Sequence, residues 1–258
     1  MKSVKGGARL LFNYILDVVF PVECLGCRKE GEWICGECAR TIPINSSPYC
    51  LSCKRKTNHG EFCSNCKDDY NLDGVFIASD YDNRIIKQGI KTLKYKFAHN
   101  ISGELAKLLI LFLKEQIKRS QFSEWITQAD SVENLPNIFK NFSEAIIMSV
   151  PLHKKRLRWR GFNQAEKLAL PIAENFNLEV NTENLRRVKN TRAQAKLNEV
   201  ERRKNIKESF AWQGKILNGR NIILIDDVAT TGSTMEECAK VLKLAGAGEV
   251  WGAVVAKG

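Results

Sequence analysis

The residues best suited to chemistry in this 258-residue chain are two adjacent aspartates, Asp226 and Asp227, which follow the apolar run Ile222–Ile225. A loop of small and hydroxyl-bearing residues comes next: Ala229, Thr230, Thr231, Gly232, Ser233 and Thr234. Hydroxyls and backbone N–H groups just before a helix form an anion site. Carboxylates do not bind phosphate, but they accept hydrogen bonds from vicinal hydroxyls such as those of a ribose. The two halves together favour a sugar phosphate as ligand.

Three other interpretations of this motif compete with the sugar-phosphate site. A Walker B strand also ends in aspartates, but it requires a G-x-x-x-x-G-K-[ST] loop, and the sequence has none. A haloacid-type phosphatase has its two aspartates one residue apart, whereas Asp226 and Asp227 are adjacent. A structural turn without chemistry stays open as the third alternative.

Cysteines form the second candidate site. Eight of the nine cysteines fall in four C-x-x-C pairs: Cys24/Cys27, Cys35/Cys38, Cys50/Cys53 and Cys63/Cys66. Four thiolates on two such pairs can surround one tetrahedral zinc at about 2.3 Å, and a site with all four ligands is structural rather than catalytic. We therefore predict two structural zinc sites and a reducing, cytoplasmic setting.

Several questions about the cysteines stay open in the sequence. Sequential ribbons and a cross-braced arrangement both fit the spacing, and an iron–sulfur cluster is the alternative to zinc. His59 lies between two pairs and is a conceivable ligand, although eight cysteines suffice. The ninth cysteine, Cys238, is expected to be a core residue.

The charge of the chain is strongly uneven. Its formal net charge is +11, and residues 151–207 alone carry 15 Lys/Arg against 6 Asp/Glu. Such a concentration indicates a polyanionic partner, either nucleic acid or a phosphate-rich small molecule. A solvated helix face is the alternative explanation.

The elements that must position these sites alternate between strands and helices. Apolar runs predict strands over Gly74–Tyr81, Glu144–Pro151, Asn221–Ile225 and 249–258. Helical periodicity predicts helices over Gly103–Arg119, Asn163–Phe176 and Met235–Ala245. The stretches between them are interpreted as a variable connection (Ser120–Ser143), a basic loop (Pro151–Arg156) and a polar loop that leads into a helix (Leu185–Asn205). This alternation predicts an α/β fold with a mostly parallel sheet.

Three domains are expected along the chain. Residues 1–20 are interpreted as an amphipathic N-terminal helix, because Asp17 interrupts the apolar run and no small-residue cleavage site of a signal peptide follows. That run is also too short to span a membrane, which takes roughly 20 apolar residues. Residues 21–70, poor in aliphatic side chains, need metal to fold. Residues 71–258 form the main domain.

Three stretches of the sequence resemble known families. The run "ILIDDVATTGST" resembles the signature with which type I phosphoribosyltransferases bind phosphoribosyl pyrophosphate (PRPP). The segments "VPLHKKRLRWRGFNQAEKLA" and "TRAQAKLNEVERRKNIKESF" resemble those of ComF-type competence proteins, which also carry an N-terminal double zinc ribbon. The resemblance implies a type I phosphoribosyltransferase-like fold, a mostly parallel sheet flanked by helices, behind a small zinc-ribbon domain.

The resemblance also implies roles for individual residues. Asp226 and Asp227 would hold the ribose 2- and 3-hydroxyls, and residues 229–234 the 5-phosphate. Magnesium would bridge pyrophosphate and ribose oxygens, and the stretch Thr191–Lys204 would close as a lid. The pyrophosphate would have Lys154, Lys155 and Arg156 as charge partners. Two further residues would line the same site, Arg160 and Gln164.

Two functions from different classes follow. The first is a phosphoribosyltransferase-like protein that binds PRPP or a nucleotide, with an unidentified acceptor and with catalysis left open. The second is a non-catalytic adaptor of the DNA uptake machinery that binds single-stranded DNA or a competence helicase. For DNA, Trp159 and Phe162, interleaved with Arg158 and Arg160, would stack on bases, although a core-edge position is favoured for Phe162.

Overall fold

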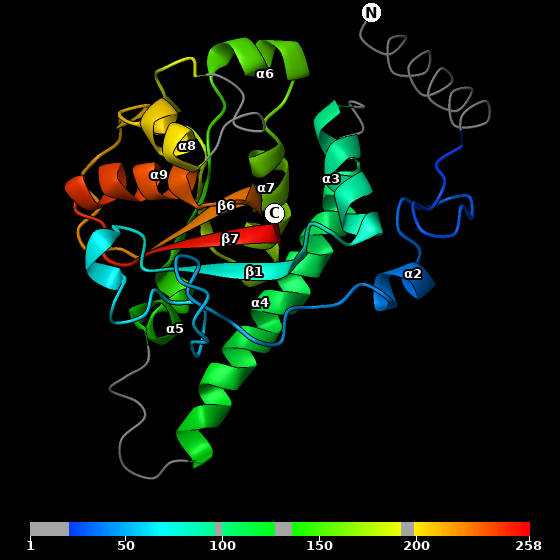
Figure 1. Cartoon of the computed structure of the whole chain (residues 1–258), viewed down its shortest axis with the longest axis horizontal. Helices are drawn as coiled ribbons and strands as arrows, with labels where there is room; N and C mark the ends of the chain where they lie inside the picture. Colours follow the sequence, from blue (N-terminus) through cyan, green and yellow to red (C-terminus); the bar gives the residue numbers. More distant parts are fainter. Residues whose placement is uncertain (1–20, 96–99, 127–135, 192–198) are drawn as a thin grey trace, which may run out of the picture.

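A computed structural model describes residues 21–95, 100–126, 136–191 and 199–258, so the helix expected over residues 1–20 lies outside the described residues. A five-stranded sheet with the order β1-β7-β6-β2-β3 forms its centre (Figure 1). All four neighbouring pairs run parallel. The strands are β1 (Gly74–Asp80), β2 (Ile146–Ser149), β3 (Glu179–Asn181), β6 (Ile222–Ala229) and β7 (Val250–Lys257). The predicted mostly parallel α/β fold is confirmed.

The four longer strands of this sheet are apolar because a parallel sheet is covered on both faces. Six of the seven residues of β1 and seven of the eight residues of β7 are buried. Phe76 of β1 stacks on Trp251 of β7 with 4.7 Å between the ring centroids. A Cβ at Gly74 would lie 2.3 Å from the Trp251 ring, so only glycine fits at the start of β1.

Helices cover the two faces of the sheet unequally (Figure 1). One hydrophobic core lies between the sheet and three helices, α3 (Arg84–Tyr95), α4 (Ile101–Ile126) and α7 (Gln164–Phe176). The other core forms with α9 (Ser233–Leu244), against which α8 (Glu199–Ile206) packs. The sequence missed α3, although Ile86, Ile90 and Leu93 are buried at helical spacing.

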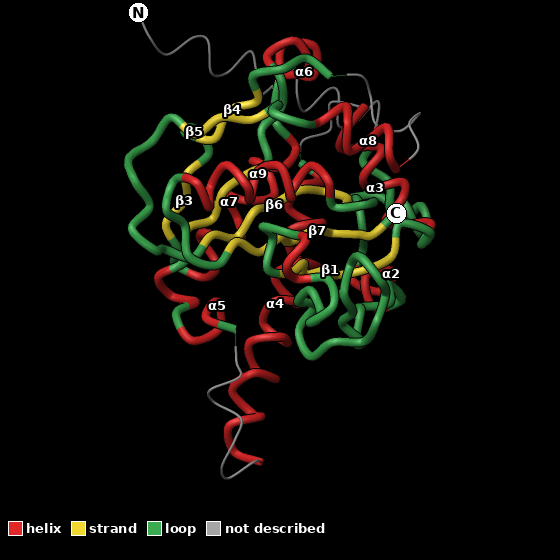
Figure 2. The backbone as a smooth tube through the Cα atoms, turned by 60° about the vertical axis from the view of Figure 1, so that its left-hand side comes forward, coloured by secondary structure: helices red, strands yellow, loops and turns green. Residues whose placement is uncertain are grey.

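The cysteine-rich segment lies along the β1 edge of the sheet (Figures 1 and 2). Its backbone pairs with that strand, since Gly60 accepts a 2.9 Å hydrogen bond from the Val75 N–H. Ile34 and Ile42 join the core on the α4 side, whereas Leu51 and Phe62 join the core on the α9 side. The segment therefore covers a free strand edge and contributes to both cores.

Three connections differ from the sequence prediction. The stretch 120–143 is not irregular throughout, because α4 continues to Ile126 and two short helices, α5 (Asn137–Lys140) and η2 (Phe142–Glu144), follow. The predicted basic loop is wrong from Lys154 on, where α6 (Lys154–Arg160) begins. The predicted polar loop begins with a short strand, β4 (Leu185–Arg187), which pairs antiparallel with β5 (Phe210–Trp212), and it leads into helix α8 as predicted. Within the described part of the chain, no helix is long and apolar enough to cross a bilayer.

Candidate functional site

The acidic pair lies inside strand β6 rather than after it. The sequence predicted that the strand ends at Ile225, but Asp226 pairs with Val254 and Val228 with Ala256 of β7. The β7 backbone continues past the apolar run and so extends the ladder. Because side chains alternate along a strand, Asp226 and Asp227 point to opposite faces of the sheet.

Asp227 is the buried member of the pair, at 2% exposed. It forms an ion pair with Lys94 of α3 and accepts a long hydrogen bond of 3.5 Å from Gln164 of α7. Arg160 donates to the side-chain oxygen of Gln164 in turn. Burial raises the pKa of Asp227, but the charge of Lys94 and the hydrogen bonds outweigh it, so this pKa is lowered. The structure thus holds Asp227 as a carboxylate.

Asp226 has the opposite electrostatic character. Burial, with the neighbouring charge of Asp227, raises its pKa well above the ordinary range. Its backbone neighbour Asp227 donates an N–H to the Asp226 carboxylate at 2.8 Å. Asp226 lines a small depression together with Val228 and residues of the loop that follows: Ala229, Thr230, Gly232, Ser233, Thr234 and Met235.

That loop turns sharply into helix α9. Gly232 adopts a left-handed conformation, with φ of 74°, at the N-cap of the helix. Thr231 and Ser233 share a hydrogen bond of 3.0 Å between their hydroxyls. The predicted helix start at Met235 is two residues late, because Ser233 is already helical. The hydroxyls and the first N–H groups of α9 therefore gather where Asp226 opens to the depression.

The basic residues that were predicted to act together all lie on helix α6, but their side chains have different surroundings. Lys154 and Lys155 are exposed near its start, where His153 caps the helix by accepting the Lys155 N–H at 3.3 Å. Gly161, at φ of 79°, ends it. Arg160 is buried and reaches the acidic pair through Gln164. Arg156 instead donates to the backbone oxygen of Thr191 at 3.0 Å.

Two cations near the acidic pair were missed by the sequence analysis. Lys94 lies on the helix that was not predicted, and Arg187 lies on strand β4, within the stretch interpreted as a loop. Arg187 donates to the Thr191 hydroxyl at 2.5 Å and lies over the Phe210 ring. Burial, and next the charge of Arg156, lower the pKa of Arg187. Half of the lid predicted over Thr191–Lys204, residues 192–198, lies outside the described residues, and the part from Glu199 on belongs to α8.

The eight paired cysteines form two separate clusters. The first consists of Cys24, Cys27, Cys35 and Cys38, the second of Cys50, Cys53, Cys63 and Cys66, and within each cluster the sulfurs lie within 4.8 Å of one another. The pairing is sequential, which settles the choice that spacing left open. His59 packs against Phe139 instead, and Cys238 is buried as expected.

The cluster geometry fits tetrahedral zinc. Sulfur separations of 3.7 Å (Cys27 to Cys35) and 3.5 Å (Cys53 to Cys63) are close to the roughly 3.8 Å expected for thiolates at about 2.3 Å from one ion. Burial opposes the thiolate of Cys24, but backbone N–H donors from Cys35, Cys27 and Gly26 lower its pKa to about 6. Donors arranged in this way favour the charged sulfur that binds metal.

Replacing one cysteine ligand is expected to remove one zinc ion and leave the other in place. The purified chain should contain two zinc ions, and Cys27→Ser or Cys53→Ser should each leave one, because the clusters share no ligand. Elemental analysis by mass spectrometry measures this, with Cys238→Ala as the matched control that keeps two. Loss of both ions in a single variant would contradict independent sites.

Comparisons with known families assign the two parts of the chain. Residues 15–67 match the double zinc ribbon domain, and residues 163–258 match the phosphoribosyl transferase domain. Together with the sheet and the cysteine clusters, these matches define a phosphoribosyltransferase-type domain that follows a double zinc ribbon.

Full-length relatives narrow this class to one family. Competence protein F of Haemophilus influenzae is 32% identical over 247 residues, covering 90% of this chain and 96% of the relative. DNA utilization protein YhgH of Escherichia coli (strain K12) is 27% identical over 239 residues, with 90% and 96% covered. Competence protein ComFC of Bacillus subtilis is 23% identical over 247 residues, with 92% and 90% covered. The chain belongs to the ComF family of competence proteins.

Proposed function

We propose that this chain binds PRPP or a nucleotide through its ribose 5-phosphate group. The observation that carries the proposal is the position of Asp226, which lines the same depression as the loop at the N-terminus of α9. One side of the depression offers hydroxyls and helical N–H groups, which suit a phosphate. The other side offers a carboxylate, which suits sugar hydroxyls. A free phosphate would leave the carboxylate without a partner, whereas a ribose phosphate satisfies both.

Each group of the ligand then has a chemical partner in the chain. The 5-phosphate takes the backbone and hydroxyls of 229–234, and Asp226 accepts from the ribose hydroxyls. Asp227 has further acceptor sites beside those that Lys94 and Gln164 occupy. Magnesium fits this donor set, because it is bound through one or two carboxylates plus substrate phosphates, and it would neutralise charge on the pyrophosphate.

The reaction that this arrangement suits is displacement at ribose C1. A bond from C1 to a nitrogen nucleophile forms while the bond from C1 to the pyrophosphate oxygen breaks, and the pyrophosphate leaves with the electron pair. The protein contributes orientation and charge stabilisation. Lys154, Lys155 and Arg156 are proposed as cationic partners of the departing pyrophosphate, with Arg187 as an addition from the structure.

Calorimetric titration of the full-length zinc-loaded chain with PRPP tests the proposal, in the presence and in the absence of magnesium. Saturable binding that strengthens with magnesium is expected. No binding to the unmodified chain would overturn the proposal, and release of pyrophosphate on addition of a nitrogen acceptor would establish turnover.

A second function, the binding of single-stranded DNA, is favoured by the surface of helix α6. Trp159 is 58% exposed beside Arg158, and Lys154 and Lys155 are exposed on the same helix. Aromatic side chains among cations are the usual platform for unpaired bases. The relatives named competence and DNA utilization proteins support a role in DNA uptake, and a helicase partner remains an expectation from the family resemblance. Phe162 packs on the core, so it is left out of this platform.

Trp159→Ala is expected to weaken binding of an oligothymidine strand about tenfold, because stacking contributes about 1–3 kcal/mol per base. Fluorescence anisotropy at several salt concentrations measures both the affinity and its salt slope. Leu157→Ala, also on α6 and 39% exposed, is the matched control and should bind like the unmodified chain. Affinity that is unaffected by high salt would exclude phosphate contacts by the basic residues.

A further inference from the structure

The second zinc ribbon packs directly on the candidate phosphate loop. Leu51, between the ligands Cys50 and Cys53, is 6% exposed. A Cβ built on Gly232 would lie 2.6 Å from the Leu51 methyl carbon Cδ2. The Leu51 side chain therefore occupies the space that any side chain at position 232 would need. The contact leaves the loop backbone no room to move toward the ribbon.

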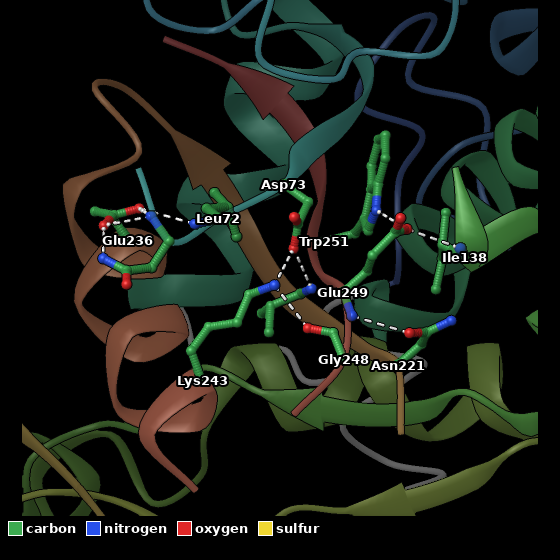
Figure 3. Close-up of polar contacts among 11 residues, drawn as sticks. Leu72, Asp73, Ile138, Asn221, Glu236, Lys243, Gly248, Glu249 and Trp251 are labelled. Carbon is green, nitrogen blue, oxygen red and sulfur yellow. Dashed lines mark hydrogen bonds and ion pairs between the residues drawn. The ribbon is translucent and has the colours of Figure 1, made fainter. Parts of the chain in front are cut away.

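Helix α9 is tied to the same region by polar contacts. Glu236, in its first turn, accepts hydrogen bonds from the N–H groups of Asn71 (3.0 and 3.1 Å) and Leu72 (3.0 Å) and from the Asn71 side-chain amide (2.7 Å). Figure 3 shows the Glu236 carboxylate beside Leu72, and Lys243 of the same helix bonded to Asp73. The segment that joins the second ribbon to β1 is thus clasped at two points by the helix that begins at the phosphate loop.

The ribbon itself reaches that clasp through side chains. Phe62, next to the ligand Cys63, stacks on Tyr70 with 4.1 Å between the ring centroids. The Tyr70 hydroxyl donates to Ser52 at 3.2 Å, and Ser52 lies between Leu51 and the ligand Cys53. The metal-binding turn, the aromatic pair and the clasp therefore form one continuous set of contacts that ends at Gly232.

The first ribbon offers an internal comparison. Its first turn reads "CLGC" where the second ribbon reads "CLSC", so Leu25 is the positional equivalent of Leu51. Leu25 packs against Gly89 of α3, and Gly26 lies beside Ile85 of the same helix. These contacts are on the opposite face of the sheet from α9, and Ile85 lies about two and a half helical turns before Lys94.

We propose that the second zinc ribbon is a built part of the phosphate site, with Leu51 as the positioning residue that holds the loop at Gly232. Zinc in the second cluster fixes the turn that carries Leu51, and the turn holds the loop in the conformation that accepts a phosphate. Preorganisation of this kind raises affinity because less ordering is left for the ligand to do. This inference rests on the proposed ribose-phosphate function. It adds that the second ribbon, and not the first, holds the phosphate loop in place.

Leu51→Ala and Leu25→Ala in the full-length chain test this directly. We expect Leu51→Ala to keep two zinc ions and to bind PRPP with magnesium about tenfold more weakly, as for a loosened loop. Leu25→Ala should bind within about twofold of the unmodified chain, because its contacts are on α3. Equal affinity of Leu51→Ala and the unmodified chain, or an equal loss in both variants, would overturn the inference.

Hydrogen exchange supplies a readout that needs no ligand. Amides of 230–236 are expected to exchange faster in Leu51→Ala and in Cys53→Ser than in Leu25→Ala and Cys27→Ser. Unchanged exchange in the second-ribbon variants would overturn the inference. Failure of the unmodified chain to bind PRPP would overturn only the proposed function, since the exchange comparison would still decide whether the ribbon holds the loop.

Discussion

Asp226→Asn is expected to lower the affinity for PRPP with magnesium by about 10- to 100-fold while leaving the free energy of unfolding nearly unchanged. Hydrogen bonds to a charged group contribute about 1.5–3 kcal/mol, and the variant loses the charge that strengthens those to the ribose hydroxyls. Stability is retained because the raised pKa of Asp226 already favours its neutral form, which asparagine resembles. Calorimetry and urea unfolding measure the two quantities.

The pH dependence of binding follows from the same carboxyl group. A ligand that needs the charged form of Asp226 must displace its proton, so the affinity should rise as the pH rises through the raised pKa. In Asp226→Asn this rise should vanish. Asp82→Asn, which changes an exposed carboxylate just beyond β1, is the matched control. Unaltered binding by Asp226→Asn would remove Asp226 from the proposed site.

Lys94→Met is expected to lower the free energy of unfolding at neutral pH by about 2–4 kcal/mol, since it leaves the buried Asp227 without its cation. The expected loss of stability is smaller than for a fully buried ion pair, because the Lys94 side chain is 24% exposed. Urea denaturation measures it, with Lys91→Met, an exposed lysine on the same helix, as the matched control.

The loss of stability caused by Lys94→Met should depend on pH in a defined direction. The folded-state pKa of Asp227 is lowered, so the stability from its ion pair is present above the unfolded value of about 4 and is lost as the pH falls through the folded value. The free energies of unfolding of Lys94→Met and of the unmodified chain should therefore approach each other as the pH falls. Lys94→Met/Asp227→Asn should be more stable than Lys94→Met alone at neutral pH, and equal stability of the two variants would contradict a dominant ion pair.

Much of the fold was predictable because its strongest signals are local. Continuous apolar runs such as Gly74–Asp80 are typical of strands buried on both faces, and the structure has a strand there. Asn163 was predicted to open a helix, and its side chain caps α7 by accepting the Ala165 N–H at 3.2 Å. The spacing of the eight cysteines alone indicated two metal sites, and the structure brings their sulfurs together in two groups of four.

The misses have physical reasons that lie outside a local window. Charge masked α6, whose seven residues contain five cations, although the left-handed Gly161 that ends it is a recognisable stop signal. Lys94 meets Asp227 across 132 intervening residues, and no local pattern reports such a meeting. The end of β6 was placed too early because two aspartates are poor strand formers, and pairing with β7 overrode that preference.

The strand order of the central sheet has a consequence for how the chain acquires its structure. Within the central sheet β1 pairs with β7, which is made some 170 residues later, so that edge of β1 has no partner strand when β1 is first synthesised. Its other edge can be covered at once, because the cysteine-rich segment that bridges to it through Glu61 and Gly74 is made just before it. Metal binding by the cysteine-rich segment would thus protect one edge of this apolar strand until β7 has been synthesised.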